Sequence, residues 1–133
     1  MFSRTYTLLG DPIPLARPRR GFNKLFDAQK QIKFSVGLQL RQQHPDDLQF
    51  QGPLSLDAVF YFSPASAWTK KKTHENLGSY HHTIPDLDNC IKFLCDVSQG
   101  IIFQNDCTIA QITAKKIYDE QARVIFTIAS LKK

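Results

Sequence analysis

The sequence has no apolar stretch long enough to cross a membrane. A transmembrane helix needs about 20 predominantly apolar residues in a row, and no window of this chain approaches that length. The first seven residues, Met-Phe-Ser-Arg-Thr-Tyr-Thr, also lack the charged segment and following apolar stretch of a secretory signal. We therefore expect a cytoplasmic protein without a membrane partner.

Cysteine is also scarce. The three cysteines, Cys90, Cys95 and Cys107, are odd in number and form no C-x-x-C pair. This argues against a disulfide framework and against the usual structural zinc sites, so we expect reduced, mostly buried thiols. The chain also lacks a phosphate-cradling G-x-x-x-x-G-K segment and a G-x-S-x-G nucleophile turn, which removes two common enzyme classes.

What the sequence does have is an uneven distribution of charge. The net charge of the 133 residues is +5, but residues 1–24 and 64–84 are basic, whereas residues 86–106 are acidic. Two basic segments beside one acidic cluster suggest a polyanion held by basic arms, with a cation bound among them. Taken singly, each segment would be interpreted as ordinary solvated surface charge.

The hydrophobic pattern predicts one domain over residues 1–133 with an α/β (α+β) fold. Strict alternation of apolar and polar residues over 54–62 predicts a strand with one buried face. A four-residue repeat, Ala28, Ile32, Val36 and Leu40, predicts a helix over 27–43 with Asp27 as its N-cap. Residues 63–84 show no periodicity and are expected to form a long loop.

The remaining elements complete a β-α-β-α-β-β order. A second helix is predicted over 86–98, with a packing stripe on one face and a charged stripe, Asp88, Lys92 and Asp96, on another. Strands are expected at 2–9, 108–118 and 122–131, the last two joined as a hairpin. The prediction is a four-stranded mixed sheet with two main helices.

The segment Pro85-Asp86-Leu87-Asp88-Asn89-Cys90-Ile91-Lys92 carries the clearest chemical signal. Two aspartates two residues apart point away from each other inside a helix. However, Asp86 as an extended N-cap and Asp88 in the first turn can converge. Mg²⁺ prefers few carboxylates, several waters and a substrate phosphate, and Asp106 is the natural third ligand. Such a site can polarise a phosphodiester and generate hydroxide, with Lys92 or Lys116 stabilising the developing charge.

A plainer interpretation fits the same residues. An Asp-Leu-Asp-Asn segment before an apolar helix is also an ordinary N-cap with an acidic first turn. The Asp88 and Lys92 pair is also a common i,i+4 pair, worth a few tenths of a kcal/mol. Spacing alone therefore leaves the metal site and the simple helix cap both open.

The basic segments are candidates for contacts with nucleic acid. Phosphate contacts of this kind are independent of sequence and sensitive to salt. Phe22 and Trp68 are candidate wedges into nucleic acid, although packing is the commoner role for such residues. The candidate phosphate-binding residues are Arg17, Arg19 and Arg20 in the first segment and Lys70, Lys71 and Lys72 in the second, with Lys116 as a further candidate.

Taken together, these motifs resemble the RusA family of Holliday-junction resolvases, small Mg²⁺-dependent endonucleases frequent in phages and prophages. The similarity covers the basic loop from Gly10 to Arg20, the signature from His82 to Asp96, and the acidic element from Gly100 to Asp106. Lys116 and Tyr118 resemble the lysine-bearing strand behind that element. The P-D-x-D-N-x-x-K signature with a further aspartate about twenty residues on is the most specific part.

The resemblance implies a fold, a reaction and a set of site residues. It implies that Asp86, Asp88 and Asp106 bind Mg²⁺, with Mn²⁺ as a possible substitute, and that Lys92 is essential. It further implies a homodimer that hydrolyses two opposed phosphodiesters of a four-way DNA junction in recombination and repair. Asn105 stands where many relatives have another acidic residue, so a fourth carboxylate is not expected.

Two other functions remain open at this stage. The first is a non-catalytic DNA-binding module whose acidic cluster only caps a helix. The second is a nucleotide-sugar transferase that uses the Asp86-Leu87-Asp88 triplet to hold a metal, but a chain of this length leaves little room for separate donor and acceptor sites. Loss of cleavage with retained binding in an Asp88→Asn variant separates the nuclease from the binding module.

Overall fold

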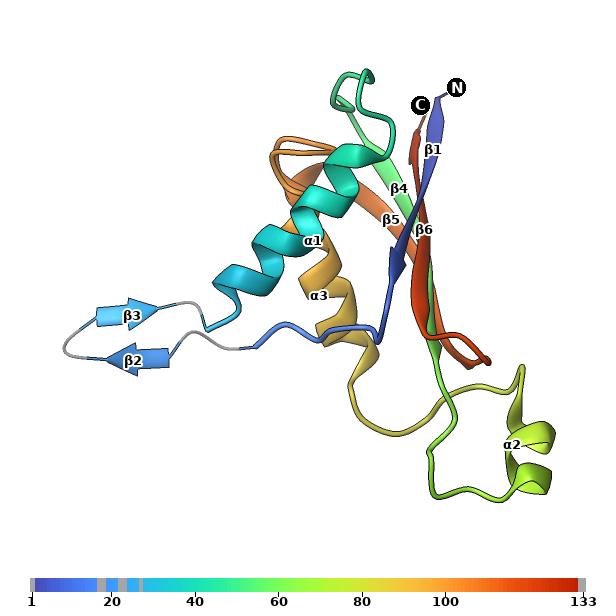
Figure 1. The fold of residues 1–133 in the computed structure, drawn as a ribbon. Helices are drawn as coiled ribbons and strands as arrows, with labels where there is room; N and C mark the ends of the chain where they lie inside the picture. The colour runs from blue at the N-terminus through green and yellow to red at the C-terminus, as the bar shows by residue number, and fades with distance from the viewer. Residues whose placement is uncertain (1, 17–18, 22–23, 27, 132–133) are drawn as a thin grey trace.

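The main sheet of the molecule contains four strands in the spatial order β1-β6-β4-β5 (Figure 1). The computed structural model describes residues 2–16, 19–21, 24–26 and 28–131. Strand β4 pairs in parallel with β5 and antiparallel with β6, and β1 pairs antiparallel with β6. The sheet is therefore mixed, and the predicted α+β class is confirmed. The strands are β1 (Ser3–Leu9), β4 (Leu54–Phe62), β5 (Ile109–Tyr118) and β6 (Arg123–Ser130).

The predicted alternation in β4 is confirmed. Every second residue of this strand is buried, and Leu54, Ala58 and Phe60 are each 1% exposed or less. A strand of period two places these side chains on one face of the sheet, where they form the floor of the core. Because β4 has a neighbour on each side, its backbone groups are paired along both edges.

Two helices, α1 (Lys30–Gln42) and α3 (Leu87–Ser98), lie on the same face of the sheet (Figure 1). The predicted packing stripe of α3 is confirmed in kind: Leu94 and Ser98 are buried, and Leu87 and Ile91 pack against the core half-buried. Its charged stripe is exposed, as expected. None of the described helices combines the length and the apolar character that a membrane crossing requires.

The predicted hairpin of the last two strands is wrong. Strands β5 and β6 follow each other closely in the chain, but β4 lies between them and pairs with both. The long connection from β4 to β5 contains α3 and returns the chain parallel to β4, as a helical crossover permits. A polar turn between two apolar strands does not reveal whether a third strand occupies the space between them.

Helix α1 is shorter than the 27–43 predicted. Asp27, the expected N-cap, lies outside the described residues. Val36 and Leu40 of the predicted stripe are buried, but Ile32 is 42% exposed. The beginning of α1 extends away from the sheet (Figure 1), and residues 30–32 are exposed.

The segment 63–84, expected to be a loop, contains the short helix α2 (Lys70–Asn76). The side chain of Thr69 caps it by accepting a hydrogen bond of 3.1 Å from the Lys72 N–H. Helix α2 has no hydrophobic stripe, so the periodicity of the sequence did not predict it. The Thr69 cap stabilises its first turn instead. At the other side of the molecule, β2 (Arg19–Gly21) and β3 (Lys24–Phe26) pair away from the main sheet (Figure 1). Strand β2 lies in the basic loop from Gly10 to Arg20 and the residue after it, a segment that we call the N-terminal arm.

Candidate functional site

The two clustered aspartates occupy the start of α3 as predicted. Asp86 is the N-cap residue with extended backbone dihedrals (φ −68°, ψ 139°), and Asp88 lies in the first helical turn. Asp86 makes no side-chain capping hydrogen bond, and both residues are exposed. The Asp86 carboxylate is therefore not used to cap the helix and is free to bind a ligand.

Lys92 lies one helical turn after Asp88 on the same exposed stripe. Its Nζ is 3.9 Å from Asp88 Oδ2, and the two side chains are 61% and 70% exposed. An exposed i,i+4 pair of this kind is worth a few tenths of a kcal/mol. The other Asp88 oxygen, Oδ1, accepts a hydrogen bond of 2.9 Å from the Asn89 N–H. Neither contact is strong enough to hold Asp88 away from a cation.

Asp106 lies near the opposite end of α3. It begins the 3₁₀ helix η1 (Asp106–Thr108), and its N–H donates to Gln99 Oε1 at 3.0 Å. Gln99 is the C-cap residue of α3, whereas Asp86 is the N-cap residue. A helix rises about 1.5 Å per residue, so the two ends of α3 are roughly 16 Å apart.

The described part of one chain does not gather the predicted metal ligands. Within it, no three or more histidine, cysteine, aspartate or glutamate side chains lie close enough together to hold a metal ion. The chemistry of the donors suits Mg²⁺, because all three predicted ligands are carboxylates. Their placement in a single chain does not, since Asp86 and Asp88 are at one end of α3 and Asp106 is near the other.

Lys116, one of the predicted DNA-contacting residues, is in the interior. The residue is 9% exposed, and its Nζ donates two hydrogen bonds of 2.6 Å, to the carbonyl oxygens of Thr83 and Pro85. The ammonium also lies 5.7 Å from the centre of the Phe62 ring. This position is at odds with the expectation that Lys116 contacts a phosphate.

The lysine cluster lies on α2, beyond the end of β4 (Figure 1). Lys70, Lys71 and Lys72 are exposed on the first turn of this helix. Lys72 Nζ lies 4.6 Å over the ring of Trp68, which is half-buried and also contacts Tyr118. Trp68 therefore packs under the helix and supports the lysines, which favours its packing role over that of a wedge.

The N-terminal arm is described only in part. Arg19 and Arg20 lie on β2, which with β3 forms the ribbon that extends from the body of the molecule. The wedge candidate Phe22 and the arm residue Arg17 lie outside the described residues. Their predicted roles stay predictions.

The thiols near the site are not nucleophiles. Burial raises the pKa of Cys90 to about 11, with Lys116 opposing and Asp86 and Asp88 reinforcing the shift. Burial likewise raises the pKa of Cys95 to about 11. Both thiols are therefore protonated at neutral pH, and the chemistry of this region falls to the exposed carboxylates. All three cysteines are free, as expected.

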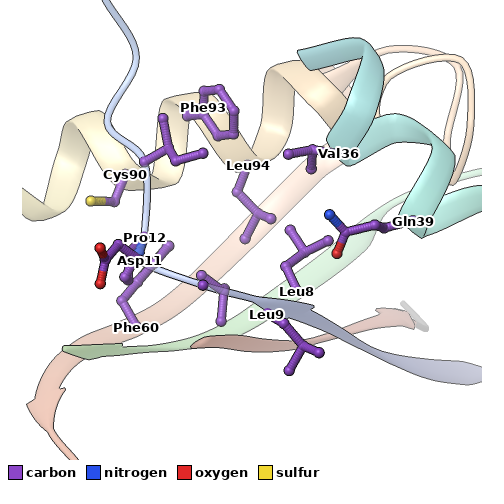
Figure 2. Close-up of a pocket in the computed structure, with 13 residues that line it drawn as sticks. Leu8, Leu9, Asp11, Pro12, Val36, Gln39, Phe60, Cys90, Phe93 and Leu94 are labelled. Atoms are coloured by element: carbon purple, nitrogen blue, oxygen red, sulfur yellow. The ribbon is translucent and has the colours of Figure 1, made fainter. Parts of the chain in front are cut away.

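Cys90 also lines a small apolar cavity beneath the start of α3. Figure 2 shows this cavity between the end of β1, α1 and α3, with Leu8, Val36 and Leu94 around it. Its volume of about 30 Å³ admits no more than one or two water molecules. The cavity is a packing gap and is too small to be a substrate pocket.

His81 is a residue of this region that the sequence did not assign. Its ring stacks on Phe62 at a centroid distance of 4.0 Å, and its Nδ1 atom is buried without a hydrogen-bond partner. Burial lowers its pKa, and the positive charges of Lys116 and His82 lower it further. The neutral ring thus packs beside the buried Lys116. The sequence did hold a signal for the interior position of Lys116. Side chains alternate along β5, so Lys116 lies on the same face as the buried Tyr118.

Comparison with known proteins identifies the family of this chain. The family model for endodeoxyribonuclease RusA matches residues 10–129. This range begins directly after β1 and includes every later element, apart from Ser130 at the end of β6. The chain belongs to the RusA endodeoxyribonuclease family. The resemblance inferred from the sequence is therefore confirmed, and membership of the RusA family supports an endonuclease that resolves Holliday junctions.

Two curated relatives match this chain over at least 90% of their own length. "Uncharacterized protein YqaN" of Bacillus subtilis (strain 168) is 30% identical over 129 residues, which cover 90% of this chain and 90% of YqaN. "Crossover junction endodeoxyribonuclease rusA" of Lactococcus phage r1t is 25% identical over 131 residues, which cover 91% of this chain and 93% of the phage protein.

Proposed function

We propose that this protein is a Mg²⁺-dependent endonuclease that resolves four-way DNA junctions by two symmetric phosphodiester cuts. The observation that carries the proposal is the pair of exposed aspartates at the start of α3, in a chain that the RusA family model covers from residue 10 to 129. Because the Asp86 carboxylate is not used as a cap, it is available to a cation. Mn²⁺ is the expected substitute, since it accepts the same oxygen ligands.

The separation of Asp106 from the other aspartates supports a site built from two subunits. In a dimer with twofold symmetry, if residue i contacts residue j, then j also contacts i. When two copies of α3 lie antiparallel across the axis, the start of one helix meets the end of the other. Each cation is then held by Asp86 and Asp88 of one subunit with Asp106 of the partner subunit, and the dimer has two such sites.

The roles of the other residues follow from their exposure. When bound, the cation supplies the positive charge that polarises the phosphodiester for attack by water. Lys92 is exposed beside Asp88, and its ammonium can neutralise charge that develops on the cleaved phosphate. Arg17, Arg19 and Arg20 of the arm and Lys70, Lys71 and Lys72 of α2 are proposed to hold the phosphates of the DNA arms.

Two cuts require two sites in a fixed relation, which is the reason for proposing a homodimer. A four-way junction has approximate twofold symmetry, and a dimer of the same symmetry presents one site to each of two opposed strands. A soluble monomer with one incomplete site would bind a junction but would not resolve it.

The decisive experiment incubates the purified protein with a synthetic four-way junction and with linear duplex, each with Mg²⁺ and with a chelator. We expect paired symmetric nicks in the junction only, and only with Mg²⁺. Asp88→Asn should lose cleavage at least 100-fold and keep junction affinity within threefold. Asp46→Asn removes a similar exposed carboxylate from the connection before β4 and should cut like the wild type.

The same experiment tests the competing function, a non-catalytic DNA-binding module. The scattered placement of the three aspartates within one chain favours that alternative if no dimer forms. Binding without any cleavage by the wild-type protein in Mg²⁺ or Mn²⁺ would establish it and refute the nuclease.

A further inference from the structure

Lys116 is the one charged side chain that is buried among the described residues. No ion pair with a carboxylate is found for it in that part of the chain; its ammonium instead donates to the carbonyl oxygens of Thr83 and Pro85, each at 2.6 Å. A buried ammonium is costly unless hydrogen bonds compensate it. These two bonds and the nearby Phe62 ring provide that compensation, so the position of the charge depends on the segment that supplies the carbonyls.

That segment has no hydrophobic anchor of its own. His82, Thr83 and Ile84 are exposed, and Ile84 is 85% exposed although it is large and apolar. A surface segment of this kind is ordinarily free to adopt several conformations. Here the two carbonyls that flank Ile84 both point at Lys116, and the His81 N–H donates to the Lys116 carbonyl at 3.0 Å. Lys116 of strand β5 therefore holds residues 81–85 in place through three hydrogen bonds.

The fixed segment leads directly into the aspartates of the site. Pro85 carries one of the two bound carbonyls and immediately precedes Asp86, the N-cap residue of α3. Holding this carbonyl sets the direction in which the chain enters the helix. It thereby sets where the carboxylates of Asp86 and Asp88 lie relative to the rest of the molecule.

We infer that Lys116 is a positioning residue that holds residues 83–85 and so aims Asp86 and Asp88, and that it does not contact DNA. The inference rests on the proposed nuclease function only for its effect on cleavage. Its effect on the 83–88 backbone holds whatever the reaction is. A small misplacement of a reacting group lowers a rate by about 100-fold. Loss of the two hydrogen bonds from Lys116 should therefore impair cleavage far more than binding.

The test compares Lys116→Met with Lys115→Met. Both variants remove one positive charge from the same strand, but Lys115 is exposed and Lys116 is buried. Junction affinity is measured over a range of salt concentrations with a chelator present, cleavage is measured under single-turnover conditions with Mg²⁺, and amide hydrogen exchange is measured on the free protein. Lys116→Gln, whose amide can still donate to one carbonyl, replaces Lys116→Met if the latter does not fold.

For Lys116→Met we expect cleavage to fall about 100-fold, junction affinity to stay within threefold, and exchange to accelerate at residues 82–89 but not in β4 or β6. Lys116→Gln should lie between this variant and the wild type, and Lys115→Met should cut at the wild-type rate. A phosphate contact would instead lower the salt slope of binding by about one and weaken affinity. That result, or unchanged exchange at 82–89, would overturn the inference.

The two proposals fail in different ways. If neither the wild type nor Lys115→Met cuts a junction, the proposed nuclease function is wrong, and the exchange data still decide whether Lys116 orders the segment. If the wild type cuts and Lys116→Met cuts within threefold of it, the nuclease stands and the positioning role of Lys116 is refuted.

Discussion

At the scale of single residues, burial separates the three cysteines into two kinds. Cys90 and Cys95 are buried with pKa values raised to about 11, whereas Cys107 is exposed. The thiolate is the form that reacts with alkylating reagents. We predict that iodoacetamide at pH 8 modifies Cys107 and leaves the other two intact in the folded protein, as peptide mass spectrometry can establish. Modification of all three in denaturant is the control, and rapid labelling of Cys90 in the folded state would contradict its assigned environment.

The lowered pKa of His81 predicts a dependence of stability on pH. The unfolded ring titrates near its ordinary value of 6.5, but the folded ring resists protonation because it is buried beside Lys116. Its contribution to stability is therefore complete above pH 6.5 and is lost as the pH falls below that value. Urea unfolding between pH 7.5 and 5 should show this loss. In His81→Phe, which retains a ring against Phe62, the loss should be smaller, and an equal loss in both proteins would rule out His81 as its source.

At the scale of elements, the contact between α1 and the segment after α3 is close. Gly37 is buried on α1, and a methyl group added there would lie 3.3 Å from Ile101 Cδ1. Glycine within a helix costs roughly 1 kcal/mol relative to alanine. The terminal methyl of Ile101 is the flexible end of a side chain and can shift by a few tenths of an ångström.

We therefore predict that Gly37→Ala raises the free energy of unfolding by about 0.5 kcal/mol. Chemical denaturation measures this free energy. The matched control is the double variant Gly37→Ala with Ile101→Val, in which the shorter valine leaves more space for the added methyl group. A loss of more than about 1 kcal/mol in Gly37→Ala, relieved by Ile101→Val, would show that the neighbouring side chain is fixed.

The elements that the sequence predicted correctly are those with a strong local pattern. The alternation of β4 and the apolar stripe of α3 depend on contacts that the strand and the helix each make with one common core. The hairpin prediction was wrong because strand pairing depends on a third element, β4, which lies far away in the chain. Helix α2 was missed because a side-chain cap and the packing of Trp68 replace the apolar stripe that a sequence pattern can show.

At the scale of the whole molecule, the sequence indicated which residues matter better than it indicated where they lie. The start of α3 was predictable because a proline, an N-cap and a first turn are local features. The position of Asp106 was not: the predicted helix over 86–98 separates its own two ends, but the sequence of the connection after it does not show whether the chain returns to the start of the helix. The interior position of Lys116 depends on carbonyls more than thirty residues away in the chain.

The proposed two-subunit site makes a prediction that a site within one chain does not share. Asp88→Asn and Asp106→Asn should each cut at least 100-fold more slowly than the wild type as homodimers, because both of their sites are damaged. In a mixed dimer, one site carries both substitutions and the other carries neither. If each site draws on both subunits, the mixed dimer has one intact site and nicks one strand of the junction.

Co-expression of the two variants with different affinity tags gives mixed dimers that two purification steps isolate. We expect these dimers to nick a four-way junction at about half the rate of wild-type dimers and to leave the opposed strand uncut. A tagged mixed dimer of wild type and Asp88→Asn calibrates the activity of one damaged site. If the Asp88→Asn and Asp106→Asn dimer is as inactive as either homodimer, while sedimentation shows that it is assembled, then each chain must bring its own three aspartates together and α3 must rearrange when DNA binds.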